Sequence, residues 1–215
     1  MENLIKFNSI DEYNKAMGFE TKHPLVAVVD LKKADKKAFP QEVSYYYGVY
    51  ALFLKQTYCG DITYGRMPYD YQEGTVTSFA PGQVVHVKHR PDYEPNALGL
   101  LFHPDLIRGT SLGQEIKQYS FFSYSSTEAL HLSEQEKMIY KDCLEKIKIE
   151  TERPIDNHSK KLICRNIELL LDYCMRFYER QFITRKVVNR DILTKFENEL
   201  DGYFEGDTAA VNGLP

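Results

Sequence analysis

The stretch YQEGTVTSFAPGQVVHV, residues 71–87, alternates apolar residues with turn formers in a pattern typical of β-structure. Glu73-Gly74 and Pro81-Gly82 each favour a turn for a backbone reason: glycine tolerates positive φ, and proline presets φ. The segments that follow these turns, Thr75–Phe79 and Val84–His89, have the length and composition of short strands. The stretch therefore predicts two strands joined by a tight Pro-Gly turn.

The same pattern continues on both sides of this stretch. Short apolar runs predict further strands at Leu25–Asp30, Tyr45–Lys55, Asp61–Tyr64 and Ala97–Phe102. Turn formers such as Arg90-Pro91 separate these runs. Several short strands at this spacing favour a barrel or a sandwich, so we expect β-structure from about residue 25 to residue 103.

From residue 132 onward the apolar spacing becomes that of helices. Ser133 and Glu136 fit a capping box, in which each side chain accepts from the backbone amide of the other residue. Asp156 follows Pro154 and is a plausible N-cap for a second helix. That helix carries an apolar seam at spacings of four and three residues, made of Ile163, Ile167, Leu170, Cys174 and Phe177.

The segment RFYERQFITRKVVNRD, residues 176–191, mixes basic and aromatic side chains. Cations near a helix C-terminus interact favourably with the backbone dipole, so we expect a helix end followed by a packed hairpin. A third helix would then open at Asn189, with Ile192, Phe196, Leu200 and Tyr203 on one face. The alternatives are docking of a DNA-reading domain or contact with phosphate beside it.

The composition is that of a folded protein, with 43% hydrophobic and 27% charged residues. A formal net charge of −4 argues against a large nucleic-acid-binding surface on this chain. None of the four cysteines stands in a CxxC pair, so we expect reduced, packed thiols. The sequence shows neither an apolar signal segment after Met1 nor an apolar run of membrane-spanning length, and we expect a cytoplasmic protein with no membrane partner.

Several segments together resemble a known family. Residues 71–87 resemble the sheet segment of small cupin barrels. FHPDLIRGTSLGQEIKQYSFFSY (102–124), EALHLSEQEK (128–137) and RFYERQFITR (176–185) resemble the N-terminal half of AraC-type bacterial transcription regulators. The similarity is closest to the group common in Bacteroides and its relatives, and it runs from about residue 25 to the end of the chain.

The resemblance implies an α+β protein whose cupin-like β-barrel is followed by two or three dimerising helices. We expect a ligand-sensing barrel with an N-terminal arm at residues 1–130, a helical dimerisation region at 131–205 and a linker at 206–215. In the family the linker leads to a C-terminal helix-turn-helix domain, which this chain lacks. The expected partners are a second copy of the chain, an unidentified small-molecule effector, and DNA through the missing domain alone.

Metal-binding cupins differ from this chain in one respect. Their first motif supplies two histidines and a carboxylate, but no HxH pair stands between Val43 and Tyr71 here. His86 alone does not make a site, because stable metal binding needs three or four converging donors. We therefore expect no metal, no other cofactor and no enzymatic activity. The alternatives are a stand-alone cupin enzyme acting on a sugar or small acid, and an interaction module with a filled barrel that senses nothing.

The candidate ligand-binding residues come from the alternation of side chains along strands. Tyr45 and Tyr47 share one face, where they either wall a pocket or simply fill the barrel end. His86 and Lys88 share a face of the predicted strand Val84–His89, and we expect His86 to point inward and hydrogen-bond a ligand or a core tyrosine. Arg66, in a predicted hairpin, either binds an anionic ligand or is a solvated turn arginine.

The seam of the second helix, Ile163 to Phe177, has two interpretations. It is the candidate dimer contact, because such a stripe resembles one face of a coiled coil. The alternative is packing within one subunit against the neighbouring helices. The two interpretations differ in whether a single chain already buries the stripe.

Overall fold

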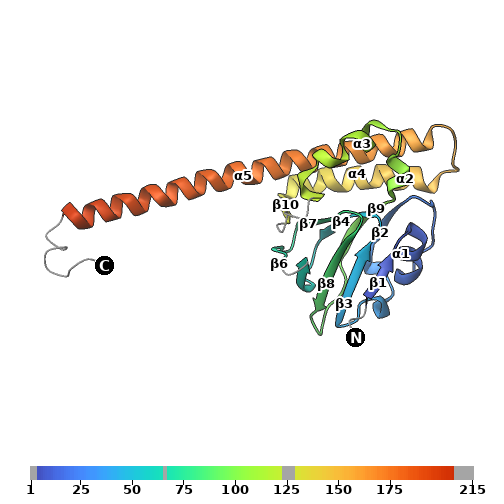
Figure 1. Cartoon of the computed structure of the whole chain (residues 1–215), viewed down its shortest axis with the longest axis horizontal. Helices are drawn as coiled ribbons and strands as arrows, with labels where there is room; N and C mark the ends of the chain where they lie inside the picture. The colour runs from blue at the N-terminus through green and yellow to red at the C-terminus, as the bar shows by residue number, and fades with distance from the viewer. Residues whose placement is uncertain (1–3, 65–66, 123–128, 206–215) are drawn as a thin grey trace. The chain divides into compact units, whose positions relative to one another are not determined.

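The computed structural model describes residues 4–64, 67–122 and 129–205 (Figure 1). Its strands are β1 Leu4–Phe7, β2 Val26–Asp30, β3 Glu42–Tyr47, β4 Tyr50–Lys55, β5 Gly60–Tyr64, β6 Met67–Pro68, β7 Thr75–Phe79, β8 Gln83–His89, β9 Ala97–Phe102 and β10 Leu130–His131. Its α-helices are α1 Ile10–Met17, α2 Pro104–Ile107, α3 Ser111–Glu115, α4 Glu134–Glu152 and α5 Ser159–Glu205. The α+β class predicted from the sequence is confirmed.

Most predicted strands lie where the sequence placed them, but Tyr45–Lys55 was wrongly expected to be one strand. It forms β3 and β4, which belong to different sheets. The chain turns between them at Gly48, whose amide donates to the carbonyl of Phe7 at 2.8 Å. A Cβ on Gly48 would lie 3.0 Å from the Cα of Asn8, so the close approach of the two backbones favours glycine.

Two five-stranded sheets form the β-structure. Their strand orders are β1-β3-β8-β5-β6 and β10-β7-β4-β9-β2. The pairings are antiparallel except between β1 and β3, which run parallel. Within the described residues no strand pairing joins the two sheets, so the closed barrel expected from the sequence is not observed.

The two sheets face each other across a shared apolar core. Tyr47 of β3 stacks on Phe79 of β7 with ring centroids 5.2 Å apart, and Tyr13 of α1 lies 6.3 Å from Phe53 of β4. The opposite face of the second sheet is also apolar, with Leu52, Leu54, Leu100 and Phe102 fully buried. Helix α4 contacts β2 of this sheet, so the second sheet is a middle layer between the first sheet and the helices.

The first turn of α4 confirms the predicted capping box. The amide of Glu136 donates to Oγ of Ser133 at 3.3 Å, and the amide of Ser133 donates to the Glu136 carboxylate at 2.8 Å. Asp156 likewise accepts from the amides of His158 and Ser159, at 2.7 and 2.9 Å, just before α5. These local contacts fix where both long helices begin.

The apolar seam of α5 is buried within a single chain. Its five residues, Ile163, Ile167, Leu170, Cys174 and Phe177, are each at most 5% exposed. Cys143 and Tyr140 of α4 lie near Cys174, and burial raises the pKa of the Cys174 thiol far above its ordinary value. The seam is therefore an intramolecular contact in this structure, and its assignment to the dimer interface is corrected.

Helix α5 does not end in the hairpin that the sequence suggested. It continues as one helix from Ser159 through Asn189 to Glu205, so the separate third helix is a wrong prediction. Residues 178–191 contain neither glycine nor proline, and a single Asn is a weak helix breaker. The residues expected to form the apolar face of the third helix have side chains outside the described part of the structure.

The chain divides into two compact units, Met1–Phe177 and Tyr178–Pro215. The first holds both sheets, α1 to α4 and the first part of α5. Within it, Figure 1 shows α4 beside α5. The described residues of the second unit are the remaining turns of α5.

Candidate ligand-binding site

The space between the two sheets is filled by aromatic side chains. Tyr45 and Tyr47 point into it, as their shared strand face predicted, and both are at most 6% exposed. The hydroxyl of Tyr45 donates to the carbonyl of Ala38 at 3.1 Å, and burial raises the pKa of both phenols. The remaining void measures about 40 Å³, which is close to the volume of one water molecule. Within the part of the chain that the structure describes, the space between the sheets is too small for a metabolite.

His86 and Lys88 lie on the other face of the first sheet, so the prediction of an inward His86 is wrong. Val85, Val87 and His89 are the inward residues of β8, because the apolar valines take the core face. His86 shares a 3.2 Å hydrogen bond with Oγ of Ser44, its cross-strand partner, and its Nε2 lies 3.3 Å from the Glu42 carboxylate.

The predicted ligand-binding residues therefore do not converge. Tyr45 and Tyr47 are in the core, whereas His86 and Lys88 face outward from the same sheet. Arg66 lies outside the described residues. Among the described residues, no group of three or more His, Cys, Asp or Glu side chains could hold a metal ion.

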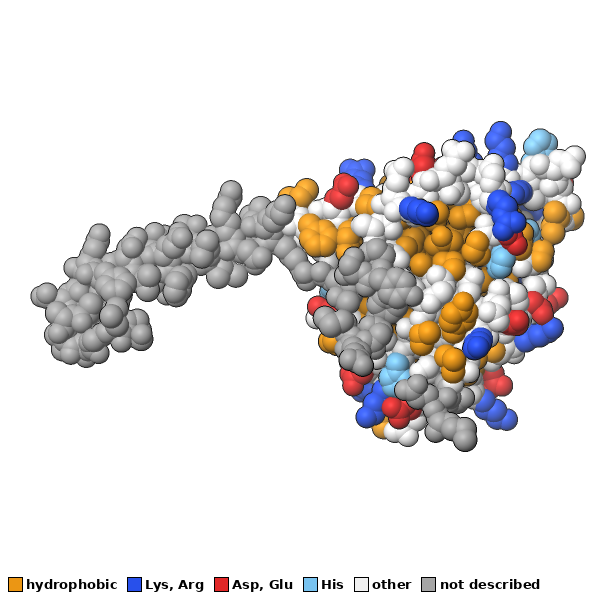
Figure 2. All heavy atoms as spheres, in the orientation of Figure 1, with side chains coloured by type: hydrophobic (Ala, Val, Ile, Leu, Met, Phe, Trp, Pro, Cys, Tyr) orange, Lys and Arg blue, Asp and Glu red, His pale blue; other side chains and the backbone are white. Residues whose placement is uncertain are grey.

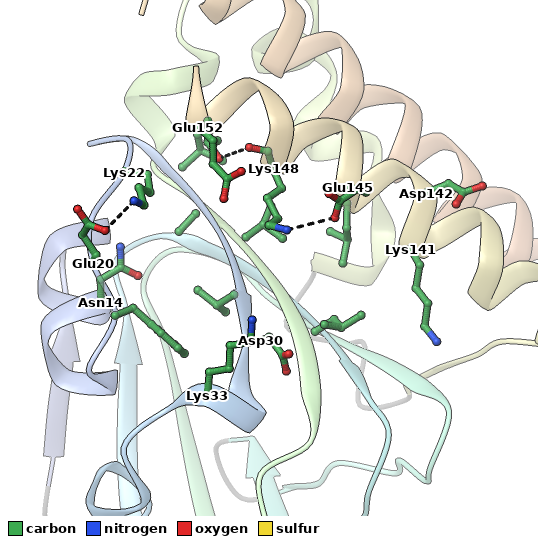
Figure 3. A pocket seen from close by; sticks show the side chains of 18 residues that line it. Asn14, Glu20, Lys22, Asp30, Lys33, Lys141, Asp142, Glu145, Lys148 and Glu152 are labelled. Atoms are coloured by element: carbon green, nitrogen blue, oxygen red, sulfur yellow. Dashed lines mark hydrogen bonds and ion pairs between the residues drawn. The ribbon is translucent and has the colours of Figure 1, made fainter. Parts of the chain in front are cut away.

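A much larger hollow lies between the second sheet and α4. Its volume is about 640 Å³, within the range of small-molecule sites. We call it the β2–α4 cleft (Figure 3). It is lined by Asn14, Phe19, Glu20, Lys22, Val26, Ala27, Val28, Val29, Asp30, Lys33, Leu98, Lys141, Asp142, Leu144, Glu145, Lys148, Thr151 and Glu152.

The cleft arises from the position of β2 at the edge of its sheet. β2 pairs with β9 on one side, and within the described residues no strand pairs with its other side. Val26, Val28 and Leu98 supply an apolar floor from β2 and β9, and Leu144 of α4 faces them across the cleft. An apolar floor with polar groups around it is the usual composition of a small-molecule site.

Asn14 of α1 supplies a buried polar group at the wall of the cleft. Its side chain is 2% exposed, and its Oδ1 has no hydrogen-bond partner among the described residues. Its Nδ2 donates to Oγ1 of Thr21 at 3.2 Å, and that hydroxyl donates to the carboxylate of Asp11 at 3.0 Å. Hydrogen bonds from Lys15 and Thr21 hold the pKa of Asp11 below its ordinary value.

Charged side chains of both signs rim the cleft. Lys22 pairs with Glu20 at 2.6 Å, and Lys148 pairs with Glu145 at 3.5 Å. Lys33 and Lys141 form no ion pair with another described residue, nor do Asp30, Asp142 and Glu152. In Figure 3 the lysines and carboxylates surround the apolar floor from the β2 side and from α4.

Sequence reasoning missed this cleft because its residues come from separate segments. The N-terminal part of the chain was interpreted as an arm, yet it contains β1 and α1. A signal for α1 was present: Ser9 caps its start, with Oγ accepting from the amide of Glu12, and Gly18 ends it at φ +79°. The pairing of α4 with β2 left no signal in the sequence.

Comparisons with known proteins add no family assignment. No protein-family model matches the chain, and no curated protein matches it. Among the described residues, none of the helices has the length and apolar character needed to cross a membrane.

Proposed function

We propose that this chain is the ligand-sensing and dimerisation region of an AraC-type transcription regulator in the cytoplasm. In this proposal its two sheets are a cupin-like fold, a small-molecule effector binds the chain, and an attached helix-turn-helix domain reads DNA. The support is the set of segments that resemble the family, together with an α+β unit in which a two-sheet fold precedes a pair of long helices.

The observation that carries the sensing role is the β2–α4 cleft. It combines a volume of about 640 Å³ with an apolar floor and a buried acceptor. Helix α4 forms one wall of the cleft, and its Tyr140 and Cys143 lie near Cys174 of α5. A ligand that prefers one position of α4 would therefore bias how α4 packs on α5, which is a population shift.

A second candidate function is an interaction module that senses nothing. The observation that favours it is the filled interior, where the aromatic side chains leave about 40 Å³. The two candidates differ in whether a small molecule binds the β2–α4 cleft saturably. Stoichiometric iron, zinc or manganese in the purified protein would instead favour a cupin enzyme.

The proposed homodimer needs a contact other than the buried seam. Leu162 and Leu169 lie seven residues apart on α5, and are 44% and 40% exposed. Seven residues are nearly two helical turns, so both side chains lie on one face of the helix. Figure 2 shows apolar side chains gathered among charged ones on one face of the molecule. We place the dimer contact around Leu162 and Leu169.

Sedimentation equilibrium tests this function. The proposal expects a dimer for the chain and a monomer for the double variant Leu162→Glu/Leu169→Glu, because the charges would have to be buried in the contact. Ile155→Glu, at a site that is 64% exposed and off the helices, is the matched control and should remain dimeric. A monomeric wild-type chain, or a reading frame without helix-turn-helix motifs after residue 215, would contradict the proposal.

A further inference from the structure

The amide of Asn14 is held in one orientation. Thr21 uses its hydroxyl hydrogen to donate to Asp11, so it can only accept from Asn14. If the amide were flipped, two acceptors would meet at 3.2 Å, the distance now spanned by the hydrogen bond from Nδ2 to Oγ1. The carbonyl oxygen Oδ1 is therefore fixed as the group of Asn14 that has no partner among the described residues, at the wall of the cleft (Figure 3).

Thr151 of α4 supplies a second buried acceptor. Its residue is 6% exposed and lines the cleft, and its hydroxyl donates to the carbonyl of Lys148 at 2.7 Å. The donor of this hydroxyl is thus used, and its lone pairs remain. Both buried polar side chains of the cleft, Asn14 and Thr151, therefore offer acceptors to a guest.

The charges around the cleft also favour a guest without negative charge. Four lysines and five carboxylates line it, and two of the lysines are engaged in ion pairs within the wall. An anion would meet Asp30, Asp142 and Glu152 in addition to the two lysines that are left. Like charges in a partly enclosed site repel each other more strongly than in bulk water.

We propose that the β2–α4 cleft binds a small molecule with a branched apolar body and a polar end that donates hydrogen bonds, a hydroxyl or a protonated amine. The body lies on Val26, Val28 and Leu98, and the donor bonds to Oδ1 of Asn14 after a small shift of the side chains that cover this atom. This inference deepens the proposed sensing function and rests on it, because it names the class of effector.

Three probes with one apolar body test the proposal: isoamyl alcohol, isoamylamine and isovalerate. Each is titrated into the ¹⁵N-labelled chain at pH 7 while the amide signals of β2 and α4 are followed. The alcohol and the amine should shift these signals saturably. Isovalerate, which offers acceptors and a negative charge, should bind at least 10-fold more weakly.

The variant Asn14→Leu tests the role of the acceptor. It replaces the amide by an apolar group of similar size. The affinity for the alcohol and for the amine should fall by about 10-fold, which is the loss expected for one buried hydrogen bond. Asn157→Leu makes the same change just before α5, outside the cleft and at an exposed position, and should leave binding unchanged. Asn14→Asp keeps a hydrogen-bond acceptor at this position. It should therefore bind the amine even if Asn14→Leu does not.

The outcomes separate this inference from the proposed function. If isovalerate binds the cleft saturably and as strongly as the alcohol, the inference that the ligand must donate a hydrogen bond is wrong. The proposed sensing role would not be affected by this result. If none of the three probes shifts β2 or α4 in a chain that is a dimer by sedimentation, the cleft is overturned as the effector site while the dimerisation role survives. An Asn14→Leu variant that binds the alcohol as the wild type does would overturn the role of Oδ1.

Discussion

The second sheet has a hollow on each of its faces, and the two hollows are filled very differently. On the side of the first sheet, rings such as Tyr47, Phe53 and Phe79 interdigitate and leave about 40 Å³. On the side of α4, aliphatic residues and long charged side chains leave about 640 Å³. The aromatic wall that resembles a binding pocket in the sequence is the core, and the space for a guest lies where a helix covers a sheet edge.

The difference has a simple packing cause. Aromatic side chains that face each other from two sheets about 10 Å apart fill the gap between them. The edge strand β2 has no neighbour on its outer side among the described residues, and α4 bridges that edge with lysines and glutamates whose charged ends remain in water. A filled interior favours stability, whereas the cleft retains room for exchange with solvent.

The largest loss of stability should come from removing an aromatic ring from the core between the two sheets. Tyr47→Ala removes a ring that stacks on Phe79, and should lower the free energy of unfolding by about 3–5 kcal/mol. Tyr46→Ala, one residue earlier on the outward face, is the control and should cost less than half as much. Urea unfolding measures both, and equal costs would break the distinction between the two faces of β3.

A single methyl group added to the interior should also be costly. A Cβ on Gly99 would lie 2.7 Å from the ring of Phe53 and 2.8 Å from Val29 Cγ2. Gly99→Ala should therefore lower the unfolding free energy by about 1–3 kcal/mol through overpacking. In the background of Phe53→Leu the same change should cost less, and an unchanged cost in this double-mutant cycle would show that the ring is not what Gly99 accommodates.

A smaller effect should follow pH, because the filled side also buries His89. Burial, with a smaller contribution from Lys55, lowers the pKa of His89 below its ordinary value, although its hydrogen bond to Pro40 acts in the opposite direction. Below about pH 6.5 the unfolded chain takes up a proton that the folded His89 resists, so stability should fall as the pH drops through this range.

His89→Gln isolates this contribution. The variant should have a flatter dependence of the urea midpoint on pH between about 7 and 5 than the wild type, although His23, whose pKa burial also lowers, keeps part of the slope. Parallel curves for the two proteins would contradict the burial of a neutral His89.

The smallest change in stability should come from a larger side chain in the cleft. Val28→Phe places a ring over the apolar floor, where a cavity of about 640 Å³ can accept it, so the unfolding free energy should change by less than about 1 kcal/mol. A methyl group in the interior would then cost more than a ring in the cleft. A loss above about 3 kcal/mol for Val28→Phe would show that the cleft is already occupied by tightly packed side chains.

The sequence predicted the strands of this fold better than their assembly. The bounds of β7 and β9 were as expected, because alternation and turn residues are local signals. The division of Tyr45–Lys55 between two sheets depends on the contact of Gly48 with Phe7, which is 41 residues away in the chain. Long-range contacts of this kind leave no periodic trace.

The site was less predictable than the fold. The alternation along β8 correctly separated His86 from His89, but only the facing sheet decides which of the two points inward. Asn14, Thr21 and Thr151 are ordinary residues in the sequence. It is the folded chain that orients the Asn14 amide and leaves its oxygen without a partner among the described residues.

The most direct test of the account compares binding of isoamyl alcohol to the wild type, Val28→Phe and Tyr47→Phe by titration of the labelled chain. Val28→Phe places a ring on the apolar floor where the alcohol would lie and should abolish saturable shifts at β2 and α4, whereas Tyr47→Phe removes a hydroxyl from the interior and should leave the Kd unchanged. Unaltered binding to Val28→Phe together with weakened binding to Tyr47→Phe would contradict the account and place the guest between the sheets.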